Sequence, residues 1–438
     1  MNIFTSLMMR KLEGHKHGTC MCEVIALDER QIKSVFIPIT GANGAEIELF
    51  LKVGDEVKVG TLIGRRKDFY VPIFSSISGK IVAKVNRYNP IVGRATSHYE
   101  IENDFLATKA EPLPTVTFNS SREQIVTAIK EAGLVGLGGA GFPTYIKYEN
   151  VKGIDTLIIN GVECEPFLAT DFKVGELYAE DVVKGSELFR LASGASKVII
   201  AIKVHKDPVK QALTKVLLSY PNIKLVEVPD AYPMGWERTL IKKLTGRSYD
   251  KLPSEAHVLV NNLTTAYAAA RALLFGEPIT HRILTISGNG IAKPANVLVP
   301  LGTPMNLIIT FLGGYVSEEV TAFAGGPMSS KAVSDDSFVV QAPMGAFIVI
   351  QPVIKHEIAC LRCGSCTSAC PANIQPIEIK LALDGDNIAR LLKLDVMRCV
   401  ECGLCSYVCP SGIEVTEAVR KAKVKVRIAQ AKAAFAKK

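Results

Sequence analysis

Residues 136–144 read Gly-Leu-Gly-Gly-Ala-Gly-Phe-Pro-Thr, and the rest of the chain is organised around this stretch. A run so rich in glycine fits neither a helix interior nor a strand, because ordering glycine costs conformational entropy. We expect a loop whose backbone N–H groups approach a phosphate closely. The spacing differs from the Gly-x-Gly-x-x-Gly of dinucleotide folds, and the Gly-Lys-Ser/Thr of nucleoside triphosphate loops is missing. A purely structural tight turn is the alternative.

The segments around this loop predict a parallel α/β sheet. Short buried strands alternate with longer helical stretches, as expected for strands joined by crossover helices. Ser121 is a suitable N-cap for the helix that precedes the loop. The predicted strands are 156–160, 197–202 and 224–228, and the predicted helices are 124–132, 171–192 and 208–218. Further on, residues 282–309 contain only strand-like runs punctuated by glycine and proline, which predicts a small β-rich insert.

The N-terminal part of the chain predicts a β-rich domain preceded by an arm. Residues 34–101 contain short β-like runs bounded by glycines, and residues 52–64 and 71–82 resemble the two halves of a biotinyl/lipoyl-like barrel. The hairpin that carries the modified lysine in such domains is missing, so no lipoyl or biotinyl attachment is expected.

Residues 1–33 are poorly patterned and predict an N-terminal arm. This arm contains His15, His17, Cys20 and Cys22, whose side chains can bind metals. Their short spacing offers little geometry for a tetrahedral site. A metal-binding arm and a partly ordered arm without a ligand are therefore both open.

Eight of the eleven cysteines form two runs near the C-terminus, each Cys-x-x-Cys-x-x-Cys-x-x-x-Cys-Pro. This is the spacing of two-cluster ferredoxins, in which the fourth cysteine of each run binds the other cluster. One [4Fe–4S] cluster is therefore expected on Cys360, Cys363, Cys366 and Cys409, and the other on Cys399, Cys402, Cys405 and Cys370. Zinc sites use differently spaced pairs, and that interpretation is disfavoured.

The charge and hydropathy patterns exclude two classes of function. The formal net charge is +8, and residues 418–438 carry eight basic residues and no acid, so the rest of the chain is about neutral. A nucleic-acid-binding protein needs a basic folded face with aromatics, which is missing here. We expect a solvated helical tail, with contact to anionic lipid or an acidic partner as the alternative. No run reaches the ~18 apolar residues of a membrane span, and no signal peptide is evident.

Four motifs resemble the NADH-oxidising subunit of respiratory complex I. Residues 136–144 resemble its FMN loop, with Lys147 at the place of the family's lysine, and residues 160–166 resemble its Asn-Ala-Asp-Glu-Ser-Glu-Pro. Residues 232–237 and 261–265 resemble its Tyr-x-x-Gly-Glu-Glu and Asn-Asn-Val-Glu-Thr. The resemblance implies that Glu165 faces the nicotinamide as the catalytic residue and that FMN is bound around Gly136, Gly138, Gly139, Gly141, Lys147, Asn160, Glu163, Gly235, Glu237, Asn261 and Asn262.

Two residues depart from that pattern. Val162 replaces an aspartate and Trp236 replaces a glutamate, so the resemblance does not define the exact dinucleotide contacts at these two positions. Trp236 is the only tryptophan, and it either packs on a ring of the cofactor or belongs to the core.

The order of the domains resembles the C subunit of the Rnf complex, a membrane-bound ion-translocating ferredoxin:NAD oxidoreductase. It implies an α/β multidomain protein with a biotinyl/lipoyl-like β barrel-sandwich, a parallel α/β flavin domain, a β-grasp insert and a ferredoxin-like α+β domain. The expected parts are a 1–33 arm, a 34–110 β domain without carrier lysine, a 111–275 FMN/NADH domain, a 276–345 soluble ligand-binding β-grasp domain, a 346–425 two-[4Fe–4S] domain and a 426–438 basic tail.

This resemblance also implies a function. NAD(H) exchanges hydride with FMN, and single electrons pass through two [4Fe–4S] clusters to partner subunits of a membrane complex, with ferredoxin reached through one of them. The chain itself is expected to be peripheral, on the cytoplasmic face of the bacterial cell membrane. Two alternatives are a soluble flavin/iron–sulfur reductase of similar build, such as a cobalamin reductase or a proline-reductase-associated protein, and an electron carrier that no longer binds NADH.

Overall fold

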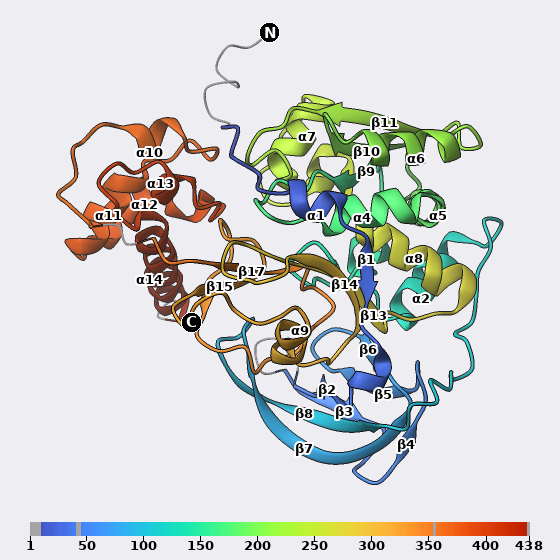
Figure 1. Cartoon of the computed structure of the whole chain (residues 1–438). Coiled ribbons are helices and arrows are strands. Elements are labelled where there is room, and N and C mark those ends of the chain that lie inside the picture. Colours follow the sequence, from blue (N-terminus) through green and yellow to red (C-terminus); the bar gives the residue numbers. More distant parts are fainter. Residues whose placement is uncertain (1–9, 41–44, 354–355, 436–438) are drawn as a thin grey trace.

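The computed structural model describes residues 10–40, 45–353 and 356–435. Figure 1 shows the β-rich N-terminal domain at the bottom, the parallel α/β domain at the upper right and the helical C-terminal domain at the upper left. A further sheet lies between these three parts. The arrangement brings the α/β domain, the central sheet and the C-terminal domain into mutual contact, and the candidate site lies where they meet.

The N-terminal domain consists of two antiparallel sheets, β2-β8-β7-β4 and β3-β5-β6. Their inward residues Val35, Ile81 and Ile101 are fully buried. The turn after β5 leans on the α/β domain, where the Tyr145 hydroxyl accepts from the Tyr70 backbone N–H at 3.2 Å. The strands are β2 (Ser34–Pro38), β3 (Ile47–Leu49), β4 (Glu56–Val57), β5 (Leu62–Arg66), β6 (Val71–Phe74), β7 (Gly79–Asn89) and β8 (Arg94–Asn103).

The α/β domain contains a four-stranded, fully parallel sheet in the order β11-β10-β9-β12. The three predicted strands are confirmed, and β12 with the following α8 was not predicted. Its strands are β9 (Thr156–Gly161), β10 (Lys197–Lys203), β11 (Ile223–Val228) and β12 (Val258–Asn262). Its helices are α2 (Arg122–Glu131), α3 (Ile146–Glu149), α4 (Thr170–Leu177), α5 (Ala179–Ser193), α6 (Asp207–Leu217), α7 (Glu237–Thr245) and α8 (Leu263–Phe275).

Helix ends in this domain follow local sequence chemistry. Ser121 caps α2 as predicted, and Gln124 returns a hydrogen bond to the Ser121 N–H at 2.7 Å, which completes a capping box. The predicted helix 171–192 is two helices, because Tyr178 between α4 and α5 has non-helical backbone angles. Helices α5 and α8 pack so closely that a Cβ at Gly185 would lie 1.8 Å from the Ala266 carbonyl oxygen.

The central sheet has six strands in the order β1-β14-β13-β17-β15-β16, with mixed directions, and its edge strand β1 is Val24–Ala26. The strand-only prediction for residues 282–309 is wrong at its end: Met305, Ile308 and Ile309 are buried at helical spacing and lie on α9. The sheet extends past residue 345, the predicted end of the third domain, because β17 pairs with β13 and β15. The elements are β13 (His281–Ser287), β14 (Ala295–Pro300), α9 (Met305–Phe311), β15 (Thr321–Ala324), β16 (Ala332–Val333) and β17 (Ala346–Ile350).

The C-terminal domain is helical, which corrects the ferredoxin-like α+β prediction. Between residues 356 and 435 the described chain has helices and turns but no β-strand. The segments between the cysteine runs carry apolar residues at helical spacing, and Ile379, Leu391 and Val419 form the core. The helices are α10 (Ser365–Ser368), α11 (Pro376–Asp384), α12 (Ile388–Lys393), α13 (Leu404–Tyr407) and α14 (Val415–Phe435). Helix α14 includes residues 418–435 of the predicted basic tail, and residues 436–438 lie outside the described part of the chain.

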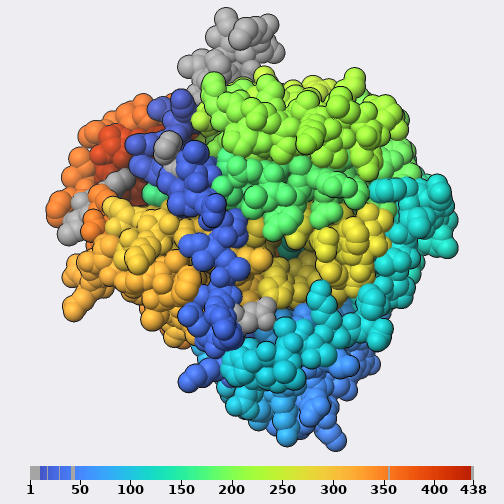
Figure 2. All heavy atoms as spheres, turned by 45° about the vertical axis from the view of Figure 1, so that its right-hand side comes forward, coloured from blue at the N-terminus to red at the C-terminus, as the bar shows by residue number. Residues whose placement is uncertain are grey.

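The described part of the N-terminal arm is ordered and docked on the body. Residues 10–27, which we call the N-terminal strap, form helix α1 (His17–Met21) and strand β1 (Val24–Ala26). Strand β1 pairs in parallel with β14 and so belongs to the central sheet. In Figure 2 the strap is the blue band that runs down the surface between the central sheet and the α/β domain. Residues 10–27 of the expected N-terminal arm are therefore ordered, and residues 1–9 of it lie outside the described part of the chain.

Candidate functional site

The glycine-rich loop is closed at its base and exposed at its tip. The Gly136 N–H donates to the Phe142 carbonyl at 2.8 Å, and the Thr144 N–H donates to the Leu134 carbonyl at 2.8 Å. Gly138, Gly139 and Ala140 form the exposed tip. Gly139 has φ +130°, a conformation that residues with a side chain rarely adopt. The loop therefore offers accessible backbone at its tip, as a phosphate-binding loop requires.

The loop is anchored over the carboxyl end of β12. Leu137 at the start of the tip is held through both backbone groups: its N–H donates to Thr265 Oγ1 at 2.9 Å, and its carbonyl accepts from Arg282 at 2.6 Å. A Cβ at Gly138 would lie 3.1 Å from the Asn262 side chain. A side chain at position 138 would therefore require the Asn262 side chain to shift by a few tenths of an ångström.

The predicted asparagines lie on neighbouring strands at the same sheet edge. Asn160 at the end of β9 is in register with Asn262 at the end of β12. The Lys147 Nζ on α3 donates to the Val260 carbonyl at 2.6 Å and lies 3.4 Å from Asn261 Oδ1. Burial lowers the pKa of Lys147. The carboxyl edge of a parallel sheet is the usual ligand-binding edge, so these residues are gathered where a ligand is expected.

The segment 232–237 packs directly against the end of β9. Asn160 Nδ2 donates to the Gly235 carbonyl at 2.8 Å, and a Cβ at Gly235 would lie 2.1 Å from the Val162 carbonyl oxygen. The Glu237 carboxylate accepts from the Tyr249 hydroxyl at 2.7 Å. Trp236 is half-buried in an apolar cluster with residues of the C-terminal domain. This position favours the packing interpretation of Trp236.

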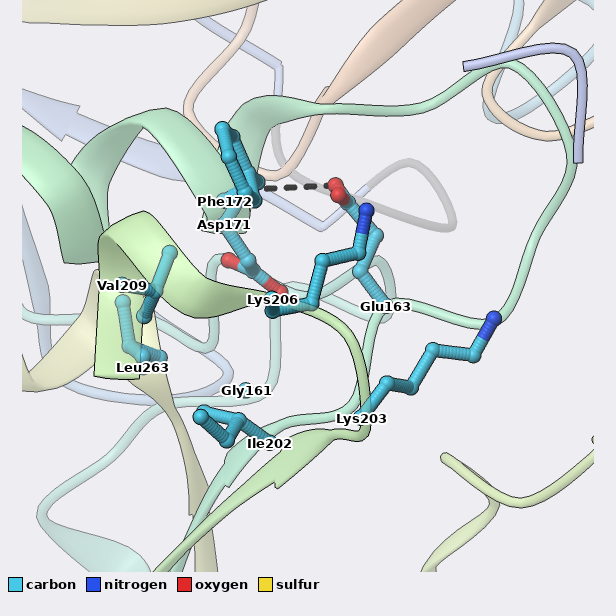
Figure 3. A pocket seen from close by; sticks show the side chains of 9 residues that line it. All are labelled: Gly161, Glu163, Asp171, Phe172, Ile202, Lys203, Lys206, Val209 and Leu263. Carbon is cyan, nitrogen blue, oxygen red and sulfur yellow. Dashed lines mark hydrogen bonds between the residues drawn. The ribbon is translucent and has the colours of Figure 1, made fainter. Parts of the chain in front are cut away.

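Two carboxyl groups meet at the start of α4 and line a pocket (Figure 3). Glu163 Oε1 accepts from the Asp171 backbone N–H at 3.2 Å, and the Asp171 carboxylate accepts from Asn262 at 2.7 Å and Thr264 at 2.6 Å. Burial and the charge of Glu163 raise the pKa of Asp171 to about 6. Figure 3 shows that the side chains of Lys206 and Glu163 lie on the same side of this pocket. The pocket is lined by Gly161, Glu163, Asp171, Phe172, Ile202, Lys203, Lys206, Val209 and Leu263.

Glu165 lies between the α/β domain and the central sheet. Its Oε2 accepts from the Met328 backbone N–H at 3.0 Å, and a Cβ at Gly326 would overlap its carboxylate. Burial raises the pKa of Glu165. The Tyr232 hydroxyl lies 3.5 Å from Glu165 Oε1 and donates to the Cys402 carbonyl at 2.7 Å. Tyr232 therefore links the predicted catalytic acid to a predicted cluster cysteine.

The N-terminal strap covers the loop that carries Glu163 and Glu165. Lys16 is buried, and its Nζ donates to the Glu163 carbonyl at 2.8 Å and lies 3.8 Å from the Glu163 carboxylate. The His15 ring stacks on Phe167 at 4.8 Å. Arg10 and Tyr232 exchange two backbone hydrogen bonds, of 3.2 and 2.7 Å. The strap thus closes the site from outside.

The strap gives no support to the metal-binding interpretation. His15 stacks on a ring, and the Cys20 sulfur lies 3.6 Å from Lys206 Nζ. Cys22 is half-buried, and the side chain of His17 is not among those described. Within the described residues, no three His, Cys, Asp or Glu side chains are gathered to hold one metal ion.

The second cysteine run and the last cysteine of the first run surround one hollow. The hollow is lined by four cysteines: Cys370, Cys399, Cys402 and Cys405. Burial raises the pKa of the Cys402 thiol to about 12 and that of Cys405 to about 11, and the neighbouring cysteines add to both shifts. This is the predicted set for one cluster, and its members come from both runs.

The other predicted set lies nearer the surface. Cys360 and Cys363 are exposed, Cys409 is half-buried and Cys366 is buried. The chain before Cys360 is tied to the chain after Cys409, because the Ile358 N–H donates to the Ser411 carbonyl at 3.0 Å and the Ser411 hydroxyl to the Ala359 carbonyl at 3.1 Å. These bonds bring the ends of the two runs together, as ligation across the runs requires.

Three side chains of this region are not predicted by the sequence patterns: Lys16, Asp171 and Arg282. Asp171 stands in the first turn of a predicted helix, a position that favours acids for structural reasons alone. Lys16 lies in the N-terminal arm and Arg282 in the predicted β-rich insert, so both come from outside the predicted flavin and cluster motifs. None of the described helices has both the length and the apolar composition to cross a bilayer.

Comparison with known families assigns three parts of the chain. Residues 11–105 match the RnfC barrel sandwich hybrid domain, residues 129–271 match the Nuo51 FMN-binding domain, and residues 359–413 match a 4Fe-4S dicluster domain. The glycine loop and the polar sheet edge lie in the FMN-binding region, and the eight cysteines lie in the dicluster region. These matches define a flavin- and iron–sulfur-dependent electron-transfer protein, with FMN and 4Fe–4S clusters as cofactors.

Curated relatives narrow the class to one family. The C subunit of the ion-translocating oxidoreductase complex of Rhodobacter capsulatus is 31% identical over 416 residues, which cover 88% of this chain and 76% of that protein. The C subunit of the proton-translocating ferredoxin:NAD(+) oxidoreductase complex of Clostridium ljungdahlii is 33% identical, and the match covers 79% of this chain and 78% of that protein. The Na(+)-translocating counterpart of Acetobacterium woodii is 32% identical, with 79% and 80% covered. The chain belongs to the family of Rnf complex C subunits.

Proposed function

We propose that this chain is the peripheral electron-transfer subunit of an ion-translocating ferredoxin:NAD oxidoreductase. It exchanges hydride with NAD(H) at FMN and delivers single electrons through two [4Fe–4S] clusters to partner subunits. The observation that carries the proposal is Tyr232, whose hydroxyl donates to Cys402 and lies beside Glu165. One side chain thereby joins the flavin region to the iron–sulfur region.

FMN, when bound, supplies the conversion between a two-electron hydride and single electrons. The residues of this chain fit that group. The exposed amides of Gly138, Gly139 and Ala140 suit a phosphate, and Lys147 brings a positive charge to the same sheet edge. Asn160 and Asn262, in register on adjacent strands, are placed to orient the rest of the flavin.

Glu165 is the residue proposed to face the nicotinamide. Its carboxylate is held by the Met328 N–H, so its orientation is fixed before substrate arrives. A Cβ at the neighbouring Gly326 would lie 2.3 Å from this carboxylate, so the glycine leaves room for it. The strap packs on this loop from outside, where Lys16 donates to the Glu163 carbonyl.

The positions of the two cysteine sets suggest an order of electron flow. Tyr232 contacts the set that consists of Cys370, Cys399, Cys402 and Cys405. The cluster on this set receives electrons first. The set Cys360, Cys363, Cys366 and Cys409 is more exposed and delivers them to a partner subunit. Burial and hydrogen bonds around each set adjust its potential.

The remaining assignments extend from the family. A soluble ligand-binding β-grasp domain corresponds to the central sheet, ferredoxin is reached through a partner subunit, and the chain sits on the cytoplasmic face of the cell membrane. The names of the relatives favour this assignment over the soluble reductases and over a carrier that has lost NADH.

Two experiments test the proposal. The purified chain should sediment with membranes that contain the partner subunits. It should stay in the supernatant when the membranes lack them. The chain reconstituted with FMN and iron should show anaerobic bleaching of its flavin absorbance by NADH. Flavin that stays oxidised in the presence of excess NADH would rule out the dehydrogenase assignment.

A further inference from the structure

Arg282 lies beneath the glycine-rich loop and comes from a different domain. It is the second residue of β13 in the central sheet and is only 3% exposed. Its Nη2 donates to the Leu137 carbonyl at 2.6 Å, and its Nε donates to the Met344 carbonyl at 2.8 Å. Arg282 therefore fixes the start of the loop tip to the central sheet.

The third nitrogen of this guanidinium has no partner. Nη1 is buried, and no acceptor for it is present among the described residues. The other unpartnered buried atoms of the described chain belong to the uncharged side chain of Gln341 and to His98, whose pKa is lowered by burial. A buried charged donor without a hydrogen-bond acceptor destabilises the folded state. We therefore expect this N–H group to have an acceptor that the described residues do not supply.

The nearby carboxyl groups do not supply the missing acceptor. Asp171 and Glu163 are close enough to favour the charged form of Arg282, but neither forms an ion pair with it within the described residues. Asp171 already accepts from Asn262 and Thr264, and Glu163 faces Lys16 and the start of α4. Burial lowers the pKa of Arg282 to about 10, so the guanidinium stays charged at neutral pH.

The ligand that fits such a donor is an anion at the glycine loop. Nη1 and Nη2 share one carbon, and Nη2 is bonded to the residue at the start of the exposed tip. The guanidinium is buried under Leu137, one residue before the exposed tip, and its flat fork of N–H groups matches the geometry of phosphate oxygens.

We propose that Nη1 of Arg282 binds the phosphate of FMN, so that the central sheet contributes a phosphate ligand to the flavin domain. This inference rests on the proposed function, since it takes FMN as the ligand of the loop. A phosphate at the loop tip would then contact both domains at the same time.

The test compares FMN with riboflavin, which differs only in lacking the phosphate. The full chain with its clusters is freed of flavin, and each flavin is titrated by quenching of its fluorescence. The wild type should bind FMN more tightly than riboflavin. Arg282→Gln should lose about tenfold or more of its FMN affinity, the range of one charge-assisted hydrogen bond, while its riboflavin affinity stays within about twofold. Arg282→Lys should keep part of the preference.

Arg122 provides the matched control. Like Arg282 it donates to backbone carbonyls of other segments, with Nε 2.9 Å from the Ala192 oxygen and Nη2 2.5 Å from the Tyr148 oxygen. It lies at the start of α2, and these bonds hold it away from the loop tip. Arg122→Gln should lower the melting temperature and leave the ratio of FMN to riboflavin affinity unchanged.

The possible outcomes separate the inference from the function on which it rests. If Arg282→Gln and Arg282→Lys weaken both flavins equally, or neither, Arg282 only holds the loop and the inference is wrong. If Arg282→Gln weakens NADH binding but not FMN, the guanidinium serves the dinucleotide and the inference is again wrong. If the wild type binds neither flavin, the proposed function itself fails.

Discussion

At the scale of single residues, Glu165 is the side chain on which the hydride-transfer proposal depends. Each of its oxygens has a close neighbour, the Met328 N–H or the Tyr232 hydroxyl, and its burial raises its pKa. A carboxylate that is fixed in this way needs no rearrangement to orient a substrate.

We expect Glu165→Gln to reduce the rate of flavin reduction by NADH about tenfold or more, because the nicotinamide loses an oriented charge. The FMN content should stay the same, since the phosphate loop is unaffected. Stopped-flow absorbance under anaerobic conditions measures the rate. Glu318→Gln, at an exposed position, is the control. An unchanged rate in Glu165→Gln would remove Glu165 from the catalytic site.

Asp171 predicts a pH dependence of stability. Its pKa is about 6 in the folded chain against an ordinary 3.8, so between these values the folded state binds more protons than the unfolded state. Stability therefore falls as pH rises through this window, by at most ~3 kcal/mol from this group. The melting temperature of the wild type should fall between pH 4.5 and 7, and Asp171→Asn should show a smaller fall. Equal falls would contradict the buried, proton-binding role.

The sequence identifies the residues that lie in motifs but not those that complete the site from elsewhere. Asn160 ends a predicted strand and Glu163 follows it closely, so their position at the sheet edge follows from the α/β pattern. Asn262 ends β12, which that pattern does not predict. Lys16 and Arg282 reach the same place from the N-terminal strap and from β13. Neither segment has a local pattern that shows where it will dock, because docking depends on tertiary packing.

At the scale of elements, the N-terminal strap is the feature that differs most from expectation. Residues 10–27 make contacts with the α/β domain, the central sheet and the C-terminal domain, and Leu12 packs in the cluster with Tyr232 and Cys402. The low periodicity of this segment predicts little order. Its order comes from docking along a domain junction, which short-range patterns do not reveal.

We expect Lys16→Met to destabilise the strap by about 1–3 kcal/mol, because the Glu163 carbonyl and carboxylate lose a charged partner in a buried place. Limited proteolysis should then cut within the strap sooner, and NADH should bind less tightly. Lys11→Met, at an exposed position of the same strap, should behave as the wild type. Equal protection of Lys16→Met and wild type would contradict the role of Lys16.

Other elements show where sequence patterns succeed and fail. The strands β9, β10 and β11 are predictable because each is a short, nearly continuous apolar run. The helix at residues 305–311 is missed because the prolines and glycines before it suggest more turns. The C-terminal domain has helices where α+β structure is expected, because the buried apolar residues between and after the cysteine runs recur at helical spacing.

At the scale of the whole molecule, the cysteine runs predict that each cluster depends on both runs. We expect Cys409→Ala and Cys370→Ala each to lower the iron content from about eight to about four atoms per chain. Cys164→Ala should keep about eight, since Cys164 lies outside the runs. Iron and labile sulfide analysis measures this. Retention of all the iron in either variant would contradict the ligation across the runs.

The order of the domains could be predicted from their motifs, but their contacts could not. The hydrogen bond from Tyr232 to Cys402 joins residues 170 positions apart in sequence, and nothing local to either residue indicates the other. This contact puts Cys402 next to Tyr232, whose hydroxyl also lies beside Glu165. The electron order proposed for the chain depends on that arrangement.

The most direct test of the electron junction is an anaerobic reaction of the reconstituted chain with NADH, followed by stopped-flow absorbance and freeze-quench EPR. We predict that the flavin bleaches and that signals of reduced [4Fe–4S] clusters follow. In Cys370→Ala the flavin should still bleach, while the remaining cluster should be reduced far more slowly. Reduction of that remaining cluster at the wild-type rate, or NADH without effect on flavin and clusters, would contradict the account.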